Sequence, residues 1–478
     1  QPEWADHVNS EFLANSMNIS GQVYLYDELD SDPRDIVGVF DDQNQCHGFA
    51  NITHDVQTTE TGLYLTVFDS QASGRPLNFR LWQYSTGREI VLTPAVGGDL
   101  QSPTITFQKD AMLGTDKPVR FDGGEAFVQN FKLQQGWNWV SFNLKSTQLS
   151  DVNTLLGSMK WSDGDIVTDM TSDTTLVYKN KEWLSTGSMA NKSLSPKKSY
   201  AIRVAEPSVF YVGGTIIKKE ADRTIDLEQG WNAIGYTPMT NLTVESALSD
   251  YYDNAYTGDV IKSHTEFAYF TKSGNTGRWR GSLQYMKPGE GYMMLRKGNG
   301  TASFTYPFYE LESAFRFNAP ARRTATMETQ NPATQWLGTM IVMATVEGFE
   351  LEEGDRLLAY TGGELSGLSA VSGLPADETP EPLYLTIGGD KQADIWFAIE
   401  RDGDIVATSG KVMTFHANDV VGTPDEPFAI LFGDASGIDL VCGDYEPGKW
   451  YTVSGVQLPA RPTKKGVYIY NYRKVVIK

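Results

Sequence analysis

The stretch LQQGWNWVSFNL at residues 133–144 returns as LEQGWNAIGYTP at residues 227–238. Each copy places Gly-Trp-Asn at the head of an apolar segment that alternates with period two, which is typical of a half-buried β-strand. The copies differ at the second tryptophan, because Trp139 of the first copy is Ala233 in the second. A strand repeated this closely indicates duplicated modules, and the order of those modules decides the fold.

The duplication extends well beyond this one strand. Later landmarks keep their order, with GDIV at 164–167, Trp183, Pro196 and Tyr200 in the first copy against GDVI at 258–261, Trp279, Pro288 and Tyr292 in the second. The offset from proline to tyrosine is four in both copies. We name these modules B1 and B2, and we predict that residues 130–213 and 224–308 share one topology.

A second pair of repeats, A1 and A2, encloses the B modules. The matches are DIVGVF at 35–40 with DRLLAY at 355–360, LYLT at 63–66 with 383–386, LNFRLWQYSTGREI at 77–90 with ADIWFAIERDGDIV at 393–406, and a Gly-Thr turn before a proline from Met112 and from Val420. We therefore predict that residues 12–122 and 328–432 also share one topology.

The segments between these landmarks predict a mostly β chain. They are short, rich in β-branched and aromatic residues, alternate with period two, and are separated by Gly, Asp, Asn and Pro clusters. We expect tandem antiparallel β-sandwich modules in the order A-B-B-A, followed by a short β tail. Each B module adds one short helix, at 146–159 and 240–252, where Ser or Thr precedes an acidic residue and apolar positions at helical spacing. The expected bounds are 1–125 for A1, 126–215 for B1, 216–312 for B2, 313–335 for a linker, 336–440 for A2 and 441–478 for the tail.

Composition limits the classes of partner. With 60 acidic residues against 40 basic ones, the formal net charge of the 478-residue chain is −20. Such a chain repels phosphate backbones, so we expect no nucleic-acid partner. The longest apolar runs, such as MIVMATV at 340–346, are far shorter than the ~20 residues of a membrane-spanning helix, so we expect no membrane span.

The two cysteines predict neither a disulfide framework nor a structural zinc site, which need more of them. Cys46 and Cys442 fall in modules that are separated by both B copies. We therefore predict that they are not bonded to each other.

The two copies of a module act as an internal control for binding residues. A residue kept in both copies serves the shared fold, and a residue that differs is free to serve something else. Trp137 and Trp231 are kept, so we interpret them as structural. Trp139 is not kept, and it is either a glycan-stacking residue or a packing residue between modules.

The same comparison selects further tryptophans. In the aligned A strands, Arg80 stands against Trp396 and Trp82 against Ala398, so both tryptophans are expected on the outward face. In B2, Trp279 lies between Arg278 and Arg280 in a glycine-rich hairpin that B1 lacks. An aromatic residue between two guanidinium groups suits an acidic or hydroxyl-rich ligand, although a surface hairpin without a ligand is the alternative.

An acidic loop in A1 raises the possibility of a metal. YDELDSDPRD places Asp27, Asp30, Asp32 and Asp35 between two strands, where oxygen-rich loops can bind calcium. The spacing lacks the EF-hand pattern, so a solvated turn is the alternative. We found no HExxH, GxSxG or phosphate-loop motif, and we therefore predict no catalytic residues and no cofactor other than this possible calcium.

The last 29 residues carry a family resemblance. Tyr451 precedes a short strand and a turn at Gly455, residues 465–469 read KGVYI, and the end is basic at Lys474 and Lys478. This segment resembles the C-terminal sorting segment of type IX secreted Bacteroidetes proteins, although Asn-Tyr at 471–472 replaces the usual Asn-Gly turn. The modules resemble repeats in large surface proteins of the same bacteria. The resemblance implies export to the cell surface by a secretion machinery and implies no chemistry.

Physically, the tail is expected to form two short strands around a turn, which are too small to fold alone. It should therefore dock on A2 or be held by the sorting machinery.

These observations favour a non-catalytic, secreted, multi-domain β-sandwich protein at the extracellular or outer cell surface. We expect it to act in adhesion or glycan binding, with a glycan or a host or bacterial surface protein as partner. An alternative is the C-terminal accessory region of a larger secreted hydrolase. A third hypothesis is an enzyme with its own carboxylate site, which would need paired carboxylates with perturbed pKa values in a cleft.

Overall fold

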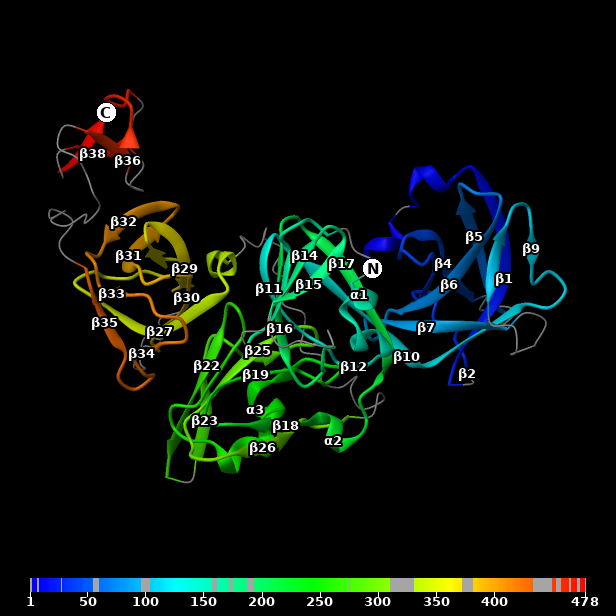
Figure 1. Ribbon diagram of the computed structural model, residues 1–478, viewed down its shortest axis with the longest axis horizontal. Helices are drawn as coiled ribbons and strands as arrows, with labels where there is room; N and C mark the ends of the chain where they lie inside the picture. Colours follow the sequence, from blue (N-terminus) through cyan, green and yellow to red (C-terminus); the bar gives the residue numbers. More distant parts are fainter. Residues whose placement is uncertain are drawn as a thin grey trace.

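The computed structural model shows a row of β modules from A1 to the tail (Figure 1). Strands form most of the described chain and every helix is short, so the predicted fold class is confirmed. The structure describes residues 2–6, 8–26, 28–54, 60–95, 104–156, 161–171, 175–186, 193–274, 276–309, 331–371, 381–432, 449–452, 457–463, 466–470 and 473–477.

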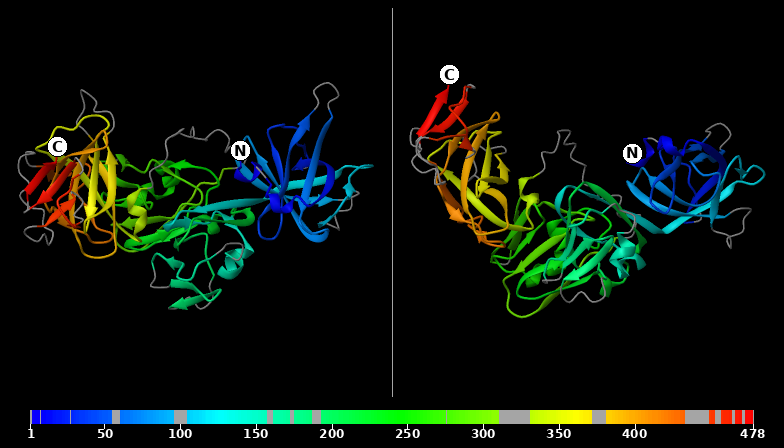
Figure 2. Two further views of the ribbon diagram at one scale, coloured as in Figure 1. Left: turned by 90° about the horizontal axis from the view of Figure 1, so that it is seen from above. Right: turned by 45° about the horizontal axis from the view of Figure 1, so that its top comes forward.

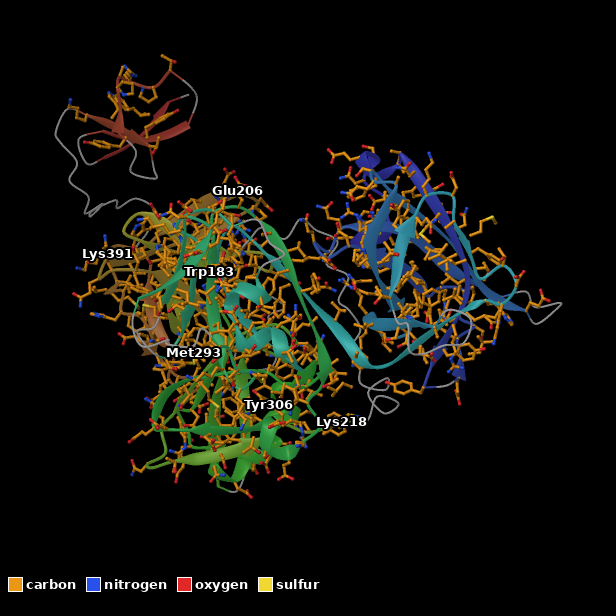
Figure 3. The ribbon with its side chains drawn as sticks, turned by 45° about the vertical axis from the view of Figure 1, so that its right-hand side comes forward. Trp183, Glu206, Lys218, Met293, Tyr306 and Lys391 are labelled. Carbon is orange, nitrogen blue, oxygen red and sulfur yellow. The ribbon has the colours of Figure 1, made fainter. Side chains whose placement is uncertain are left out.

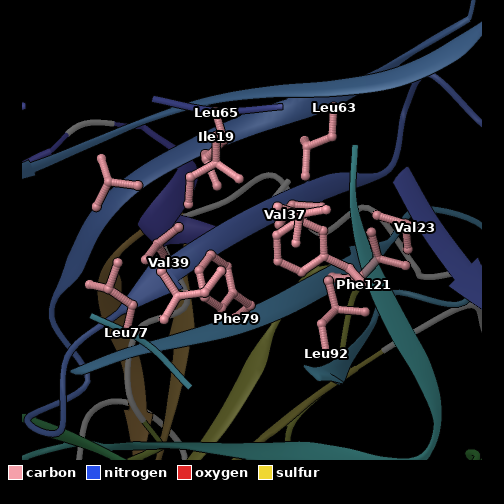
Figure 4. Packing of buried hydrophobic residues seen from close by; sticks show 14 of the residues in the cluster. Ile19, Val23, Val37, Val39, Leu63, Leu65, Leu77, Phe79, Leu92 and Phe121 are labelled. Atoms are coloured by element: carbon pink, nitrogen blue, oxygen red, sulfur yellow. The ribbon is translucent and has the colours of Figure 1, made fainter. Parts of the chain in front are cut away.

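Module A1 is a sandwich closed into a barrel. Its strands are β1 (Asn15–Leu25), β2 (Glu28–Leu29), β3 (Ile36–Phe40), β4 (Cys46–His54), β5 (Thr61–Asp69), β6 (Ser73–Gln83), β7 (Arg88–Ala95), β8 (Ile105–Gln108), β9 (Met112–Leu113) and β10 (Val119–Leu133). They pair in the order β10-β7-β6-β3-β4-β5-β1, and a parallel pairing of β1 with β10 closes the ring. Alternate side chains such as Leu65, Phe79 and Phe121 fill its interior (Figure 4).

Module A2 repeats the main strand pairings of A1, but its strands form two separate sheets. Its strands are β27 (Gly338–Glu347), β28 (Arg356–Thr361), β29 (Glu364–Ala370), β30 (Leu383–Gly389), β31 (Asp394–Arg401), β32 (Asp404–Thr408), β33 (Met413–Thr414), β34 (Val420–Val421) and β35 (Phe428–Leu431). The β1–β5, β1–β10 and β3–β6 pairs of A1 correspond to the β27–β30, β27–β35 and β28–β31 pairs, with the same orientations. Among the described residues no ladder joins β29 to β30 or β32 to β35, so A2 remains two sheets.

The structure corrects the alignment of one A strand by two residues. Val39 of β3 pairs with Phe79, and the equivalent Ala359 of β28 pairs with Phe397. Phe79 therefore corresponds to Phe397, and the predicted matches of Arg80 with Trp396 and of Trp82 with Ala398 are wrong. The cause is the following hairpin, which has four residues at 84–87 in A1 and two at 402–403 in A2. A shift of two preserves the face on which each side chain lies.

The B modules share one strand order. Their strands are β11 (Gly136–Ser141), β12 (Leu144–Lys145), β13 (Ile166–Asp169), β14 (Thr175–Lys179), β15 (Glu182–Thr186), β16 (Ser199–Val204) and β17 (Ser208–Ile216) in B1, and β18 (Thr224–Leu227), β19 (Gly230–Ile234), β20 (Leu242–Thr243), β21 (Val260–Lys262), β22 (Phe267–Ser273), β23 (Thr276–Gly281), β24 (Tyr285–Met286), β25 (Tyr292–Arg296) and β26 (Ala302–Thr305) in B2. The main sheets run β11-β16-β13-β14-β15 and β19-β25-β21-β22-β23, which is the same order in both copies.

The short helices expected after the first strand are present in both B modules. In B1, η3 (Thr147–Ser150) precedes α1 (Val152–Leu155), and the Asp151 side chain accepts a hydrogen bond from the Thr154 N–H. In B2, α3 (Val244–Ala247) is capped by Thr243, whose hydroxyl accepts from the Ser246 N–H, and η4 (Ser249–Asn254) follows. A further one-turn helix, α2 (Glu220–Arg223), joins the modules.

The repeated Gly-Trp-Asn motif folds each strand entrance by the same hydrogen bonds. Gly136 and Gly230 adopt left-handed φ angles of 95° and 98°. The Asn138 side chain accepts from the Gln134 N–H at 2.9 Å and donates to the Gln134 carbonyl at 2.8 Å. Asn232 makes the same pair of bonds to Glu228, each at 2.9 Å. Glycine permits the left-handed turn, and the side-chain hydrogen bonds of asparagine stabilise it. The glycine and asparagine of each motif are therefore structural.

One strand joins A1 to B1 without a break. The first part of β10 pairs with β1 and β7 of A1, and its last part pairs with β17 of B1. The expected boundary at 125/126 lies inside this strand. A register shift against β7 between Gly123 and Phe127 lies where the pairing with β1 ends and the pairing with β17 begins. Figure 2 shows β10 running from the barrel into the B modules.

The tail forms its own small sheet of four strands instead of the two expected. They are β36 (Trp450–Thr452), β37 (Gln457–Leu458), β38 (Gly466–Tyr470) and β39 (Arg473–Ile477), in the order β37-β36-β38-β39. Within the described part of the chain, no strand of A2 pairs with this sheet. Most of the expected linker lies outside the described residues, and its last residues form η6 (Pro332–Gln335).

Two smaller expectations concern cysteine and the membrane. Cys46 is a free thiol, and Cys442 lies outside the described residues. Burial raises the pKa of the Cys46 thiol to about 11. No helix among the residues described here has the length and apolar character needed to cross a membrane.

Candidate functional site

Trp139 packs between the modules, which was one of its two predicted roles. Its side chain is only 8% exposed and lies in a cluster with Ala201, Ala233 and Met293. It also stacks on His264, with ring centroids 4.9 Å apart and an angle of 6° between the planes. Met293 lies within the body formed by the B modules (Figure 3). Trp139 is therefore covered by protein on the face where a sugar would stack.

The B2 hairpin contacts A2 through one of its arginines. Arg280 donates to the carboxylates of Asp425 at 2.6 Å and Glu381 at 3.0 Å, and these ion pairs raise its pKa although burial opposes them. Trp279 packs on Phe270, with centroids 5.1 Å apart, and is half-buried. Arg278 alone of the predicted trio is exposed. The structure thus assigns much of this hairpin to module contacts.

The predicted tryptophan of A2 stacks on its own module. Trp396 lies flat on Tyr360, with centroids 4.0 Å apart and an angle of 2° between the planes. It is half-buried on the outward face of β31, as expected.

Trp82, another predicted binding residue, lines a large cleft. A hollow of about 730 Å³ lies where A1, B1 and B2 meet, within the usual volume of ligand sites. Its lining residues include Trp4, Phe40, Gln43, Asn44, Arg80, Trp82, Arg88, Glu89, Gln129, Asn130, Lys132, Asn143, Asn241 and Pro288. We call this hollow the A1–B cleft. Trp82 is half-buried there and meets Tyr84 edge-on at 5.8 Å.

The N-terminal segment contributes a second aromatic residue to the A1–B cleft. Trp4 lies in η1 (Glu3–Ala5), and its indole N–H donates to Glu89 Oε1 at 2.9 Å. It packs edge-on against Phe40, with centroids 5.2 Å apart. A Cβ at Gly38 would lie 2.6 Å from the Trp4 ring, so only glycine lets this tryptophan reach the barrel wall. The wall thus carries two indoles, held by A1.

The buried side chain of Arg80 places a positive charge beside the A1–B cleft. Arg80 is 5% exposed, and its guanidinium lies over the Phe40 ring at 4.2 Å and the Tyr211 ring at 4.4 Å. Its nearest carboxylate oxygen is Glu89 Oε2, 3.6 Å from Nη1. Burial lowers the pKa of Arg80, and the neighbouring Glu89 opposes that shift. These contacts hold the guanidinium within the barrel wall. Its positive charge therefore acts on groups in the cleft, although the side chain does not extend into the cleft.

The cleft is rich in groups that match sugar hydroxyls. Six carboxamide side chains line it: Gln43, Asn44, Gln129, Asn130, Asn143 and Asn241. Gln129 and Asn143 are buried and bond within the protein, to Ser141 and Pro238 among others. The other four are exposed or half-buried, and each can donate and accept hydrogen bonds, as a hydroxyl does. Among the described residues, the buried acceptors Asn44 Oδ1 and Asn143 Oδ1 have no hydrogen-bond partner, whereas Glu89 Oε2 lies within ion-pair distance of Arg80.

Sequence reasoning found Trp82 but missed these amides. Asn44 belongs to A1, Gln129 lies at the junction in β10, and Asn143 belongs to B1. Asn44 lies in a turn, Gln129 in a strand and Asn143 between two strands, and a single polar residue at such a position gives no signal in the sequence. These residues line one cleft only because A1, B1 and B2 pack against one another.

The acidic loop of A1 does not form a metal cluster among the described residues. Asp32 turns to Arg34, with oxygen-to-nitrogen distances of 2.7 and 2.9 Å, and this contact lowers the pKa of Asp32. Burial raises the pKa of Asp30, and it raises the Asp35 pKa to about 7. Asp27 lies outside the described residues, so calcium binding stays a prediction.

A buried lysine at the B2–A2 junction is a second feature that the sequence did not reveal. Lys262 is fully buried, and its Nζ donates to the Thr339 carbonyl at 2.9 Å, the Thr339 hydroxyl at 3.1 Å and Asn418 Oδ1 at 2.9 Å. The amine lies 4.6 Å from the centre of the Trp231 ring. None of these three acceptors is charged. Burial therefore lowers the Lys262 pKa to about 7.

No protein-family model matches this chain, and no curated protein matches it in sequence. Among solved structures it is similar, at 7% identity and a TM-score of 0.12, to BcpA, the major pilin subunit of Bacillus cereus, over 88% of this chain and 100% of that one. It is also similar, at 7% identity and a TM-score of 0.12, to the T6 backbone pilin of Streptococcus pyogenes serotype M6, over 97% of this chain and 92% of that one. Likeness at such low TM-scores carries no argument. The chain is a multi-domain β protein.

Proposed function

We propose that this chain is a non-catalytic glycan-binding protein and that the A1–B cleft holds its ligand. The observation that carries the proposal is the pairing of two indoles with four exposed or half-buried carboxamides, those of Gln43, Asn44, Asn130 and Asn241, on one lining. A sugar ring presents a C–H face to an indole and hydroxyls around its edge, so it matches both kinds of group.

The carboxylates of the cleft support binding without catalysis. Glycoside hydrolysis needs two free carboxyl groups on either side of the bond to be cleaved. In this cleft Glu89 is engaged by Trp4 and Arg80, and Glu3 is ion-paired with Lys132. The acids whose pKa values burial raises, Asp30, Asp35 and Glu266, lie outside its lining.

Replacing Trp82 by alanine tests the cleft. We expect glycan affinity to fall at least tenfold, because one stacking platform is lost, while the melting temperature changes little, since the side chain is half-exposed. The measurement is an array of neutral oligosaccharides followed by titration calorimetry. Trp396→Ala is the matched control, because Trp396 is equally half-buried on an outward A strand but lies outside the cleft. No binding by the wild type, or equal losses in both variants, would contradict the proposal.

We also propose that the protein acts outside the cell, in adhesion, and that the tail directs its export. The resemblance of residues 450–478 to a type IX sorting segment supports this. Deleting 450–478 is expected to leave the protein inside the cells of a type IX secreting host, while the full chain reaches the surface. Immunoblots of cell fractions measure this, and equal surface levels of both forms would refute it.

A further inference from the structure

A second cleft adjoins the first across β10. It has a volume of about 310 Å³, and its lining includes Asn130, Lys132, Gln134, Trp137, Trp139, His264, Pro288, Glu290 and Thr334. We call it the B1–B2 cleft. Asn130, Lys132 and Pro288 line both clefts, so the two adjoin over the same strand. Asn130 and Lys132 are exposed, so no buried wall separates them.

The second cleft has its own aromatic platform, Trp137. Its counterpart in B2, Trp231, is covered by A2, because its indole N–H donates to the Asn418 carbonyl at 3.2 Å and Lys262 lies over its ring. Trp137 instead lines the open B1–B2 cleft and is half-buried. Its indole N–H has no hydrogen-bond partner within the described part of the chain. The equivalent tryptophans therefore differ in their surroundings. Trp231 holds B2 against A2, whereas Trp137 of B1 presents its ring and its N–H donor to solvent.

We propose that the two clefts form one binding path and that the ligand is an extended oligosaccharide chain crossing β10 from Trp82 to Trp137. This inference rests on the proposed glycan binding and names the class of glycan. Together the clefts exceed about 1,000 Å³, the upper end of what a drug-sized ligand occupies. Polar groups continue along the path at Gln134 and Thr334, while aromatic rings stand at its two ends.

Two adjoining clefts distinguish oligosaccharides by their length. A short fragment fills one cleft, whereas a longer chain reaches the second without a further loss of translational freedom. Affinity is therefore expected to rise at least tenfold from disaccharides to the length that spans both clefts, and then to stay constant.

The test uses ladders of neutral gluco-, manno- and xylo-oligosaccharides of two to eight units, titrated against the full chain. Trp137→Ala should abolish the gain with length, as should Gln134→Trp, which fills the second cleft from an exposed position without removing packing. Melting curves confirm that each variant is folded. A wild type that binds all lengths equally, or variants that keep the length gain, would overturn this inference alone. Failure of every ladder to bind would overturn the proposed function with it.

Discussion

Replacing Trp139 by alanine is expected to lower the free energy of unfolding of the joined B modules by about 3–5 kcal/mol. The side chain is 8% exposed and packs on His264, Ala233 and Met293. These neighbours belong to B2, so the loss removes contacts between modules as well as within B1. Ala233 occupies the equivalent strand position in B2 and faces the same cluster, so the large ring of one copy fits over the small residue of the other.

Chemical denaturation followed by near-UV circular dichroism measures this loss. Trp82→Ala is the control, because its half-exposed ring should cost less than about 1 kcal/mol. If Trp139→Ala costs no more than that control, the packing described for the module interface is wrong.

This case shows what comparison of the copies can and cannot identify. It recognises that the B fold does not require Trp139, since Ala233 serves in its place. It cannot separate a ligand residue from a module contact, because both are specific to one copy. The distinction depends on how B1 and B2 pack, and residues far apart in the sequence determine that.

Strand order and motif roles were predictable because they rest on local physics. The Gly-Trp-Asn turn needs a left-handed residue and a side chain that bonds four residues back, and both are visible in the sequence. The register of β6 against its A2 counterpart was not predictable, because it depends on the length of the next hairpin. Closure of A1 depends on residues 120–123 of β10, which pair with β1 on one edge and with β7 on the other, and no local pattern predicts such a pairing.

The A1–B cleft illustrates the same limit for function. Trp82 was identified from its outward position, but Gln129 in β10 and Asn143 between β11 and β12 are single polar residues with no motif around them. Their side chains converge only because β10 crosses from one module to the next. A site that is formed by residues of several modules is therefore hard to recognise in the sequence of any one module.

The junction between B2 and A2 is expected to become more stable as the pH rises from 7 to 9. Burial lowers the Lys262 pKa from its ordinary value of 10.5 to about 7 when A2 is docked. Between these two values the undocked state binds more protons than the docked state, so stability rises with pH. Below pH 7 both states are protonated and this contribution is constant. From pH 7 to 9 the expected gain is about 2 kcal/mol.

His264 adds a separate step at lower pH. Its ring nitrogen Nε2 lies 2.8 Å from the Trp336 carbonyl, and burial lowers its pKa from 6.5 to about 4. By the same reasoning, stability rises between pH 4 and 6.5 and then levels off. The junction should therefore strengthen in two steps separated by a short plateau near pH 7.

Two variants assign the steps, because other groups titrate in the same range. Lys262→Met keeps a chain of similar length without the charge, and it should lose the rise from pH 7 to 9 relative to the wild type. His264→Phe keeps the stack on Trp139 and should lose only the acidic step. Calorimetric scans from pH 4 to 9 measure both differences. Parallel pH profiles for the wild type and Lys262→Met would mean that the buried amine is not discharged on docking, because the two proteins differ in that one titrating group.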